Sequence, residues 1–253
     1  HNRKVESYKV ETNWYQRWSQ HCTRHCIIPK LKGTFSDGMD QWIILEDLNT
    51  NFPLRKYQLQ LSEIKVCLKW LANFHITFLN KKPEGLWEIG TYWNLDTRPD
   101  EYEKIENIAL KSKAHIIDKI LNQCKYQTIV HGDAKLANFC FSKDGTQVAA
   151  VDFQYVGGGC GIKDVAYFIG SCLTSSECST YQNELLDYYF FELESASDKA
   201  NHSFNFKELE EEWRKMYPIA CTDFIRFMVG WMPEHRKINK YNLEIVNTVL
   251  AEL

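Results

Sequence analysis

The sequence contains no apolar run that approaches 18 residues and no block of charge of one sign. Its longest pure charge runs are Lys81-Lys82 and Glu210-Glu211-Glu212, and the formal net charge at pH 7 is -3. A transmembrane helix needs about 20 apolar residues, and a protein that binds duplex nucleic acid normally carries a basic face. We therefore expect neither a membrane span nor a nucleic-acid partner.

The sequence also lacks signs of export and of repetition. No secretion signal opens the chain, no repeat or low-complexity segment occurs, and the nine cysteines are an odd number without regular spacing. This pattern predicts a reduced, cytoplasmic protein. The chain begins with His1 rather than Met and enters helix-compatible sequence at once, so we expect that a further segment precedes it.

What is present is the composition of a folded protein, with 44% hydrophobic and 25% charged residues among 253. Apolar residues at three-to-four spacing predict helices, and short apolar runs predict strands. Helices are expected over 5–18, 61–79, 101–121, 163–175, 180–196, 206–230 and 239–252. Strands are expected over 41–45, 127–130, 138–141 and 148–153, the last two joined by a hairpin turn at 143–145. The predicted fold class is α+β, with helices dominant.

The residues with the clearest chemistry lie among the predicted strands. Asp133 stands on a loop, Asn138 follows five residues later, and Asp152 comes fourteen residues after that. Kinases use this arrangement, in which a carboxylate orients the attacking hydroxyl and Mg²⁺ neutralises the developing charge. Asp133 suits the first task, and the oxygen ligands Asn138 and Asp152 suit the second. Lys135 carries a charge that can stabilise the transferring phosphate.

Plainer explanations exist for some of these residues. Asp and Asn favour turns, but Asp133 and Asn138 occur together with His131 and Asp152, which favours a catalytic loop. We expect His131 to be a buried imidazole that braces this loop. We expect Asp164 to support the loop or to cap the helix that begins there.

The segment from His131 to Asn138 resembles the HGDxxxxN loop of the aminoglycoside phosphotransferase and choline kinase group. Over nearly the whole chain, the sequence motifs are similar to those of one branch of this group, the choline-kinase-like proteins related to ecdysteroid kinases. That similarity is carried by Ser7-Tyr8 with Glu11 and Trp14-Tyr15, Leu45-Glu46-Asp47-Leu48, Val151-Asp152-Phe153-Gln154 through Gly157, Asp164 to Phe168, and Asp223-Phe224 to Gly230-Trp231. The resemblance implies a protein-kinase-like bilobal fold, with a truncated small lobe over 1–48 and a helix-rich large catalytic lobe over 49–253.

The same resemblance implies transfer of phosphate from ATP, with Mg²⁺, to a hydroxyl of a small molecule. It implies that backbone groups of Glu46 and Leu48 bind the adenine edge. It also implies that Glu11 is the helix glutamate that pairs with a phosphate-binding lysine, and it places Trp231 and His235 near the acceptor pocket.

Two parts of a kinase ATP site are not found in the sequence. No Val-Ala-Ile-Lys-like strand precedes Glu11, and neither a GxGxxG nor a Walker phosphate loop occurs, because the glycines at 157, 159 and 161 have the wrong spacing. An alternative function therefore stays open, namely a catalytically inactive kinase-like module that binds a nucleotide or another ligand.

The segment after Asp152 bears on the substrate. Only eleven residues separate Asp152 from Asp164, which leaves no room for the activation segment of a protein kinase, so a small molecule is the favoured acceptor. Sterol, choline-like base, sugar and antibiotic all stay open, as does the oligomeric state. The glycines within 157–161 predict either a flexible wall of the acceptor pocket or a tight turn into the next helix.

Overall fold

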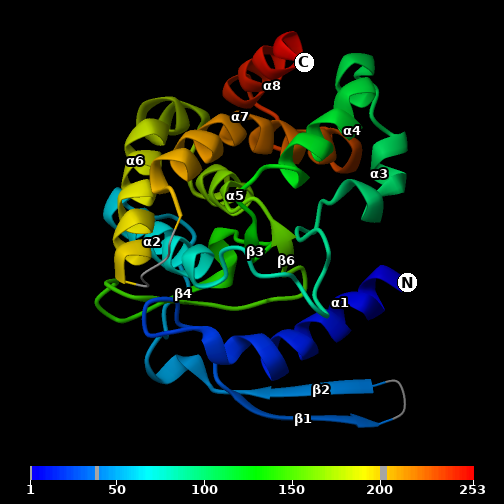
Figure 1. The fold of residues 1–253 in the computed structure, drawn as a ribbon. Coiled ribbons are helices and arrows are strands. Elements are labelled where there is room, and N and C mark those ends of the chain that lie inside the picture. Colours follow the sequence, from blue (N-terminus) through cyan, green and yellow to red (C-terminus); the bar gives the residue numbers. More distant parts are fainter. Residues whose placement is uncertain (1, 38–39, 200–203) are drawn as a thin grey trace.

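The computed structural model describes residues 2–37, 40–199 and 204–253, which form a mainly helical body with three small sheets (Figure 1). The α-helices are α1 (Asn2–Asn13), α2 (Leu61–Thr77), α3 (Pro99–Glu103), α4 (Ile108–Asn122), α5 (Ile162–Cys172), α6 (Ser175–Lys199), α7 (Phe206–Trp231) and α8 (Lys240–Glu252). A π-helix (Trp14–Trp18) continues α1, and 3-10 helices span Ser19–His21, Leu48–Thr50, Leu95–Thr97 and Leu136–Asn138. This mixture of elements confirms the α+β class.

Each of the three sheets is a pair of antiparallel strands. The pairs are β1 (Leu31–Asp37) with β2 (Asp40–Leu45), β3 (Thr128–Val130) with β6 (Gly157–Gly159), and β4 (Phe139–Phe141) with β5 (Val148–Ala150). In Figure 1 the β1–β2 hairpin and α1 lie on one side of the molecule, and α4, α7 and α8 lie on the other. β3 and β4 lie between these two parts, so the loop that joins them is placed at the junction.

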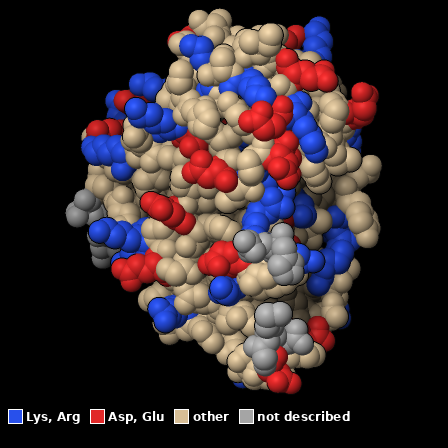
Figure 2. Space-filling model, turned by 90° about the vertical axis from the view of Figure 1, so that its right-hand side faces the viewer, with Lys and Arg blue, Asp and Glu red and all other residues tan. Residues whose placement is uncertain are grey.

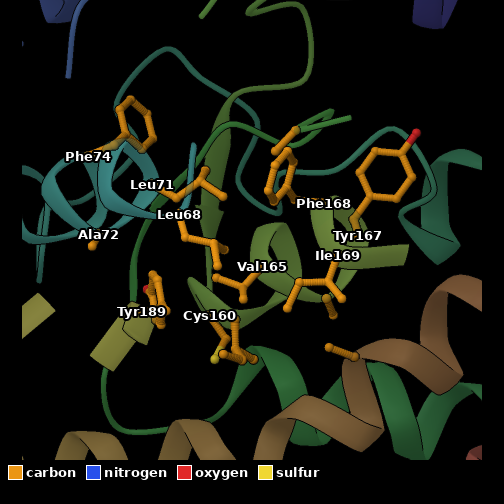
Figure 3. Close-up of a cluster of buried hydrophobic side chains, with 14 of the residues drawn as sticks. Leu68, Leu71, Ala72, Phe74, Cys160, Val165, Tyr167, Phe168, Ile169 and Tyr189 are labelled. Carbon is orange, nitrogen blue, oxygen red and sulfur yellow. The ribbon is translucent and has the colours of Figure 1, made fainter. Parts of the chain in front are cut away.

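The core of the helical part forms where α2 packs against α5 and α6. Figure 3 shows side chains of these helices meeting around Leu68, Val165 and Tyr189, all of them fully buried. Gln60 caps the start of α2, and its backbone N–H donates to the Glu63 carboxylate at 2.9 Å, which satisfies a donor at the helix start. Burying one large apolar side chain contributes about 1.5–3 kcal/mol, so this junction is a major source of stability.

Phe153 links the N-terminal part to the helical body. Its ring stacks on Trp14 with centroids 4.7 Å apart and approaches the His131 ring to 4.6 Å. Trp14 also packs against Phe74 of α2 at 5.7 Å. All four side chains are fully buried. Because Phe153 directly follows Asp152, this aromatic cluster fixes the chain on which Asp152 stands.

Most of the expected elements are confirmed, and the differences have local causes. The sequence pattern misses β1, because this strand contains Gly33 and most of its residues are exposed or half-buried, so no apolar alternation marks it. The expected helix over 101–121 is interrupted after Glu103, and α4 starts anew where Asn107 accepts a hydrogen bond from Leu110 N. The expected strand over 148–153 ends early, because Asp152 adopts a φ of 70°.

Most of the glycine cluster is a strand rather than a flexible pocket wall, because Gly157–Gly159 is β6, which pairs with β3. Only the end of the cluster forms the expected tight turn into the next helix, where Lys163 N donates to Cys160 O at 3.0 Å and α5 begins directly after Gly161. A Cβ at Gly157 would collide with the carbonyl oxygen of Trp87 and lie 2.9 Å from Gly90 Cα. The glycines are therefore needed because another segment of backbone packs directly on this strand.

The charge distribution agrees with the balanced composition. Acidic and basic side chains are interspersed over much of the face shown in Figure 2. Within the described ranges, no helix has both the length and the apolar character needed to cross a membrane.

The close packing of β6 yields a stability prediction. Gly157→Ala is expected to lower the free energy of unfolding by about 1–3 kcal/mol, because the added methyl group has no space beside Trp87. Gly170→Ala in α5 is the matched control. No atom lies within 4 Å of its added Cβ, and alanine stabilises a helix interior by about 0.5–1 kcal/mol over glycine. Urea denaturation measures both, and equal effects would contradict the packing of β6.

Candidate active site

The loop that follows β3 is held by the carboxylate of Asp164, which lies in the first turn of α5. Asp164 Oδ2 accepts from His131 N at 2.6 Å, and Oδ1 accepts from Gly132 N at 3.0 Å. His75 Nε2 lies 3.2 Å from Oδ2, and Tyr189 Oη lies 2.8 Å from His75 Nδ1. Asp164 and His75 have no exposed surface. The expected supporting role of Asp164 is thus confirmed as hydrogen bonding to the loop.

His131 also has the bracing role that its sequence context predicts. Its ring is fully buried, and Nε2 lies 3.1 Å from the carbonyl oxygen of Val151, which can only accept, so Nε2 donates. Nδ1 accepts from Asp133 N at 3.3 Å. Both ring nitrogens are used, and the imidazole connects the loop to the chain just before Asp152.

One carboxylate oxygen of Asp133 accepts hydrogen bonds, and the other has no partner in the described part of the chain. Oδ2 accepts from Lys135 Nζ at 2.6 Å and from Asn138 Nδ2 at 3.1 Å. Oδ1 is buried and has no hydrogen-bond partner within the described ranges. Burial raises the pKa of Asp133, although the charge of Lys135 acts in the opposite direction. A fixed carboxylate with one unsatisfied oxygen is what a general base for an alcohol requires.

Asn138 and Asp152 are brought together by the β4–β5 pair. Phe139 pairs with Ala150, and Val151 N donates to the carbonyl oxygen of Asn138 at 3.0 Å, so the two side chains stand at the same end of the hairpin. Asn138 Nδ2 donates to Asp133, which leaves Oδ1 as its free oxygen. Among the described residues no donor contacts the Asp152 carboxylate. The free side-chain oxygens of Asn138 and Asp152 are suitable ligands for Mg²⁺, whose remaining coordination positions are usually filled by phosphate and water.

Glu11 reaches the same region from α1. Its Oε1 accepts from Phe153 N at 3.0 Å, which places the carboxylate beside the residue that follows Asp152. Burial, followed by the negative charge of Asp152, raises the pKa of Glu11 from 4.5 to about 7. In the described ranges no lysine or arginine forms an ion pair with Glu11. The predicted pairing of Glu11 with a phosphate-binding lysine is therefore not observed here.

Of the expected hinge residues, Leu48 packs against the β4–β5 hairpin. Leu48 is buried in a small cluster with Phe52, Cys140 and Ala149. Glu46 N donates to Lys30 O at 2.8 Å and is already used. The Leu48 N–H and the Glu46 carbonyl have no backbone partner among the described residues.

A cavity of about 750 Å³ opens beside Asp133, within the size range of small-molecule sites. Lys135 and Asp152 line it together with Asp133, and so do Trp231 and His235, which the resemblance placed near the acceptor. The expected site residues that do not line it are Glu11, Glu46, Leu48 and Asn138. The cavity thus adjoins Asp133, Lys135 and Asp152 and does not extend to the residues expected to form the hinge.

Most of the other cavity residues were not singled out by the sequence. They include Tyr92, Arg98, Tyr155, Arg55, Lys56, Arg236 and Lys237, whereas Tyr167 and Phe224 lie in motifs that carry the family resemblance. They come from well-separated segments, so no local spacing marks them. The only local sequence signal for these residues is the aromatic content of the turn-rich stretch 83–99, which contains Tyr92. In the folded structure, burial raises the pKa of Tyr92 to about 12.

Comparisons with known proteins agree with this arrangement at the level of the fold. A family model described as "Uncharacterized oxidoreductase dhs-27" (DUF1679) matches residues 94–252, which is more than half of the chain. A search of curated proteins finds no match. The structure of amicoumacin kinase hAmiN with AMP-PNP, Ca²⁺ and Ami is similar at a TM-score of 0.56 and 12% identity, over 99% of this chain and 78% of that one.

A second solved structure, an aminoglycoside-3'-phosphotransferase of type VIII, is similar at a TM-score of 0.43 and 12% identity. It covers 83% of this chain and 79% of that chain. At such low identity the likeness to amicoumacin kinase concerns the fold alone, which is the protein-kinase-like phosphotransferase fold that the sequence predicts.

The role of Asp164 gives a second stability prediction. Asp164→Asn is expected to lower the free energy of unfolding by about 2–5 kcal/mol, because His131 N and Gly132 N contact different carboxylate oxygens and asparagine keeps only one of the two as an acceptor. Asp187→Asn is the control, since Asp187 is exposed and pairs with Arg214 at the surface, which is worth at most about 1 kcal/mol. Urea denaturation measures both variants. If Asp164→Asn lost no more unfolding free energy than the control, the loop would be held by contacts other than those of Asp164.

The pKa of Glu11 gives a pH prediction. Because its folded pKa is raised, the stability that its protonated form provides is complete below about pH 4.5 and is lost as the pH rises through 7. In metal-free buffer, Glu11→Gln should therefore gain about 2–3 kcal/mol relative to the unchanged chain between pH 5 and pH 8. Glu6→Gln, an exposed change on the same helix, should show no such trend. Parallel stability curves for Glu11→Gln and the unchanged chain would contradict the burial of Glu11.

Proposed function

The chain belongs to the family described as "Uncharacterized oxidoreductase dhs-27" (DUF1679), and we propose that it transfers the γ-phosphate of ATP to the hydroxyl group of a small molecule. One observation carries this proposal. Asp133 presents a buried, unpartnered oxygen beside a cavity while its other oxygen is fixed by Lys135 and Asn138. The phosphotransferase fold of amicoumacin kinase supports it at the level of architecture.

In the proposed reaction Asp133 orients the acceptor and takes its proton. Oδ1 accepts the hydroxyl hydrogen as the acceptor oxygen forms its bond to the γ-phosphorus. The bond from that phosphorus to the oxygen bridging to the β-phosphate breaks, and ADP leaves. Lys135, within 2.6 Å of Asp133 Oδ2 and partly exposed to the cavity, then lies where its charge can offset the charge that develops on the phosphate.

Asn138 and Asp152 are the residues that would hold Mg²⁺. When bound, the ion would supply positive charge to the phosphates during transfer. Asp152 stands in a left-handed backbone conformation, which costs an ordinary residue about 1 kcal/mol or more. The cost is tolerated because Phe153 is fixed by Trp14 and by the hydrogen bond to Glu11, and it directs the Asp152 side chain toward the cavity.

The finer assignments belong to the same proposal. The adenine edge would meet the free backbone groups of Glu46 and Leu48. The choline-kinase-like branch is supported by the ordered motifs of the sequence rather than by the comparisons. A cytoplasmic location is supported by the cysteines, all nine of which are free in the structure, as expected in a reducing compartment.

A second candidate is a kinase-like module that binds a nucleotide without turnover. The observation that favours it is the carboxylate of Glu11, which accepts from Phe153 N and has no basic partner in the described part of the chain. In an active kinase this glutamate pairs with the lysine that contacts the phosphates.

Replacement of the proposed base separates the two candidates. ATP consumption is measured with a panel of hydroxylated small molecules, including sterols, sugars and amino alcohols. Asp133→Asn is expected to lower the rate with the accepted alcohol about 10²–10⁴-fold while changing ATP affinity only a few-fold. Asp144→Asn, in the exposed turn between β4 and β5, is the matched control and should leave the rate unchanged.

Three outcomes would contradict the proposal. Retained turnover in Asp133→Asn would remove Asp133 as the base. ATP binding without consumption of ATP in the presence of any alcohol would favour the module. Oxidation of the alcohols with NAD⁺ or NADP⁺ in the absence of ATP would favour an oxidoreductase, the activity that the family's description names.

A further inference from the structure

Basic residues outnumber acidic residues around the cavity. In the described part of the chain its walls contain six lysine or arginine residues and two acids, Asp133 and Asp152. Both acids have roles in the proposed transfer. The rest of the wall therefore offers no carboxylate to a positively charged acceptor, and the charge of the cavity favours an anion.

Several of the basic residues already have partners. Arg98 donates to Glu101 at 3.1 Å and to Tyr92 O at 2.6 Å. Lys56 forms an ion pair with Glu63. Lys135 forms an ion pair with Asp133. Arg55 donates to backbone carbonyls of its own segment of the chain. Lys237 differs from these residues.

The ammonium group of Lys237 rests on aromatic rings and has no anionic partner. Nζ lies 4.4 Å from the ring centroid of Tyr167 in α5 and 4.7 Å from that of Phe224 in α7. Among the described residues, no ion pair or hydrogen bond involves Nζ. The backbone of Lys237 is fixed, because its N–H donates to His235 Nδ1 and its carbonyl accepts from Asn242 Nδ2.

Burying a cation without a counter-anion is unfavourable in free energy. Burial lowers the pKa of Lys237 to about 8, against the opposing effect of the negative charge on Asp133, so the group is still mainly protonated at pH 7. Cation–π contact with the two rings offsets only part of this cost. An anion that enters the cavity would give Lys237 the charge-assisted hydrogen bond that it lacks.

The surroundings of Lys237 define the rest of the ligand. Phe227 stacks on Trp231 at 5.3 Å, and Tyr92 packs edge-on against Phe227, so α7 and the Tyr92 loop form an aromatic wall next to Lys237. Tyr92, Trp231 and Lys237 all line the cavity. In Figure 1, α5 and α7 lie on the far side of β3 from the β1–β2 hairpin that leads to the hinge. Lys237 is thus at the acceptor end and not the adenine end.

We propose that the acceptor alcohol carries an anionic group that is bound by Lys237, while its apolar body lies on the aromatic wall formed by Tyr92 and Trp231. The anion can be a carboxylate, a sulfate or a phosphate ester, since each offers oxygens to an ammonium group. The inference rests on the proposed function and names the substrate class of that site. It also implies that cationic alcohols are poor acceptors.

Three probes of one shape test the inference by calorimetry at pH 7 with Mg²⁺ and AMP-PNP present. They are 6-(hydroxymethyl)-2-naphthoate, the corresponding neutral amide and the corresponding aminomethyl cation. The carboxylate is expected to bind at least tenfold more tightly than the amide, and the cation more weakly than both. Lys237→Met should reduce carboxylate affinity about tenfold, to that of the amide, and leave amide affinity within about twofold. Lys237→Arg, which keeps the charge, should retain the preference for the carboxylate.

Lys240→Met is the control, because Lys240 is exposed and lies outside this cavity. Equal affinity for the three probes, no binding of the carboxylate, or an equal loss in Lys240→Met would overturn the inference. Competition between the carboxylate and AMP-PNP would also overturn it, because Lys237 would then bind nucleotide phosphates. Binding is measured without turnover. Lost selectivity with intact ATP consumption therefore counts against this inference alone, and selective binding without consumption counts against the proposed function alone.

Discussion

The buried carboxylate of Asp164 is the constraint on which the geometry of the site depends. It accepts from two successive backbone N–H groups, those of His131 and Gly132, and so attaches the loop to α5. His131 then reaches the carbonyl of Val151, and its ring packs on Phe153. Through these contacts a single buried anion aligns Asp133, the proposed base, with Asp152, a proposed metal ligand. A loop alone would not hold two carboxylates at a fixed separation.

The same arrangement explains the electrostatics around the base. Glu11, Asp133 and Asp152 are close enough that the charge of Asp152 contributes to raising the pKa of both of the others. Lys135 offsets part of this effect at Asp133. Such an acidic group is best stabilised by a divalent cation, whereas Lys237 and the aromatic side chains of the same cavity suit an anion with an apolar body. A substrate that carries both a phosphate-accepting hydroxyl and an anion would match both features.

The sequence predicts what is local and fails where distant segments meet. The order His131, Asp133, Asn138, Asp152 predicts the loop, the hairpin and the bracing imidazole, because each depends on residues near in the chain. Strand β6 is not predictable, because its glycines are required by the backbone of Trp87 and Gly90, some 70 residues earlier. The position of Lys237 is equally hidden, since its aromatic partners lie on α5 and α7. The predicted partner of Glu11 has no counterpart among the described residues.

If Asn138 and Asp152 form a metal site that serves a nucleotide next to Asp133, ATP binding must depend on Mg²⁺. Calorimetric titration of the protein with ATP, first with Mg²⁺ and then with excess chelator, measures this dependence. Saturable ATP binding that requires Mg²⁺ is expected, and it should weaken at least tenfold in Asp152→Asn, because one of the two side-chain ligands changes from a carboxylate to a neutral amide. ATP binding of equal strength without Mg²⁺, or no binding at all, would contradict this metal site.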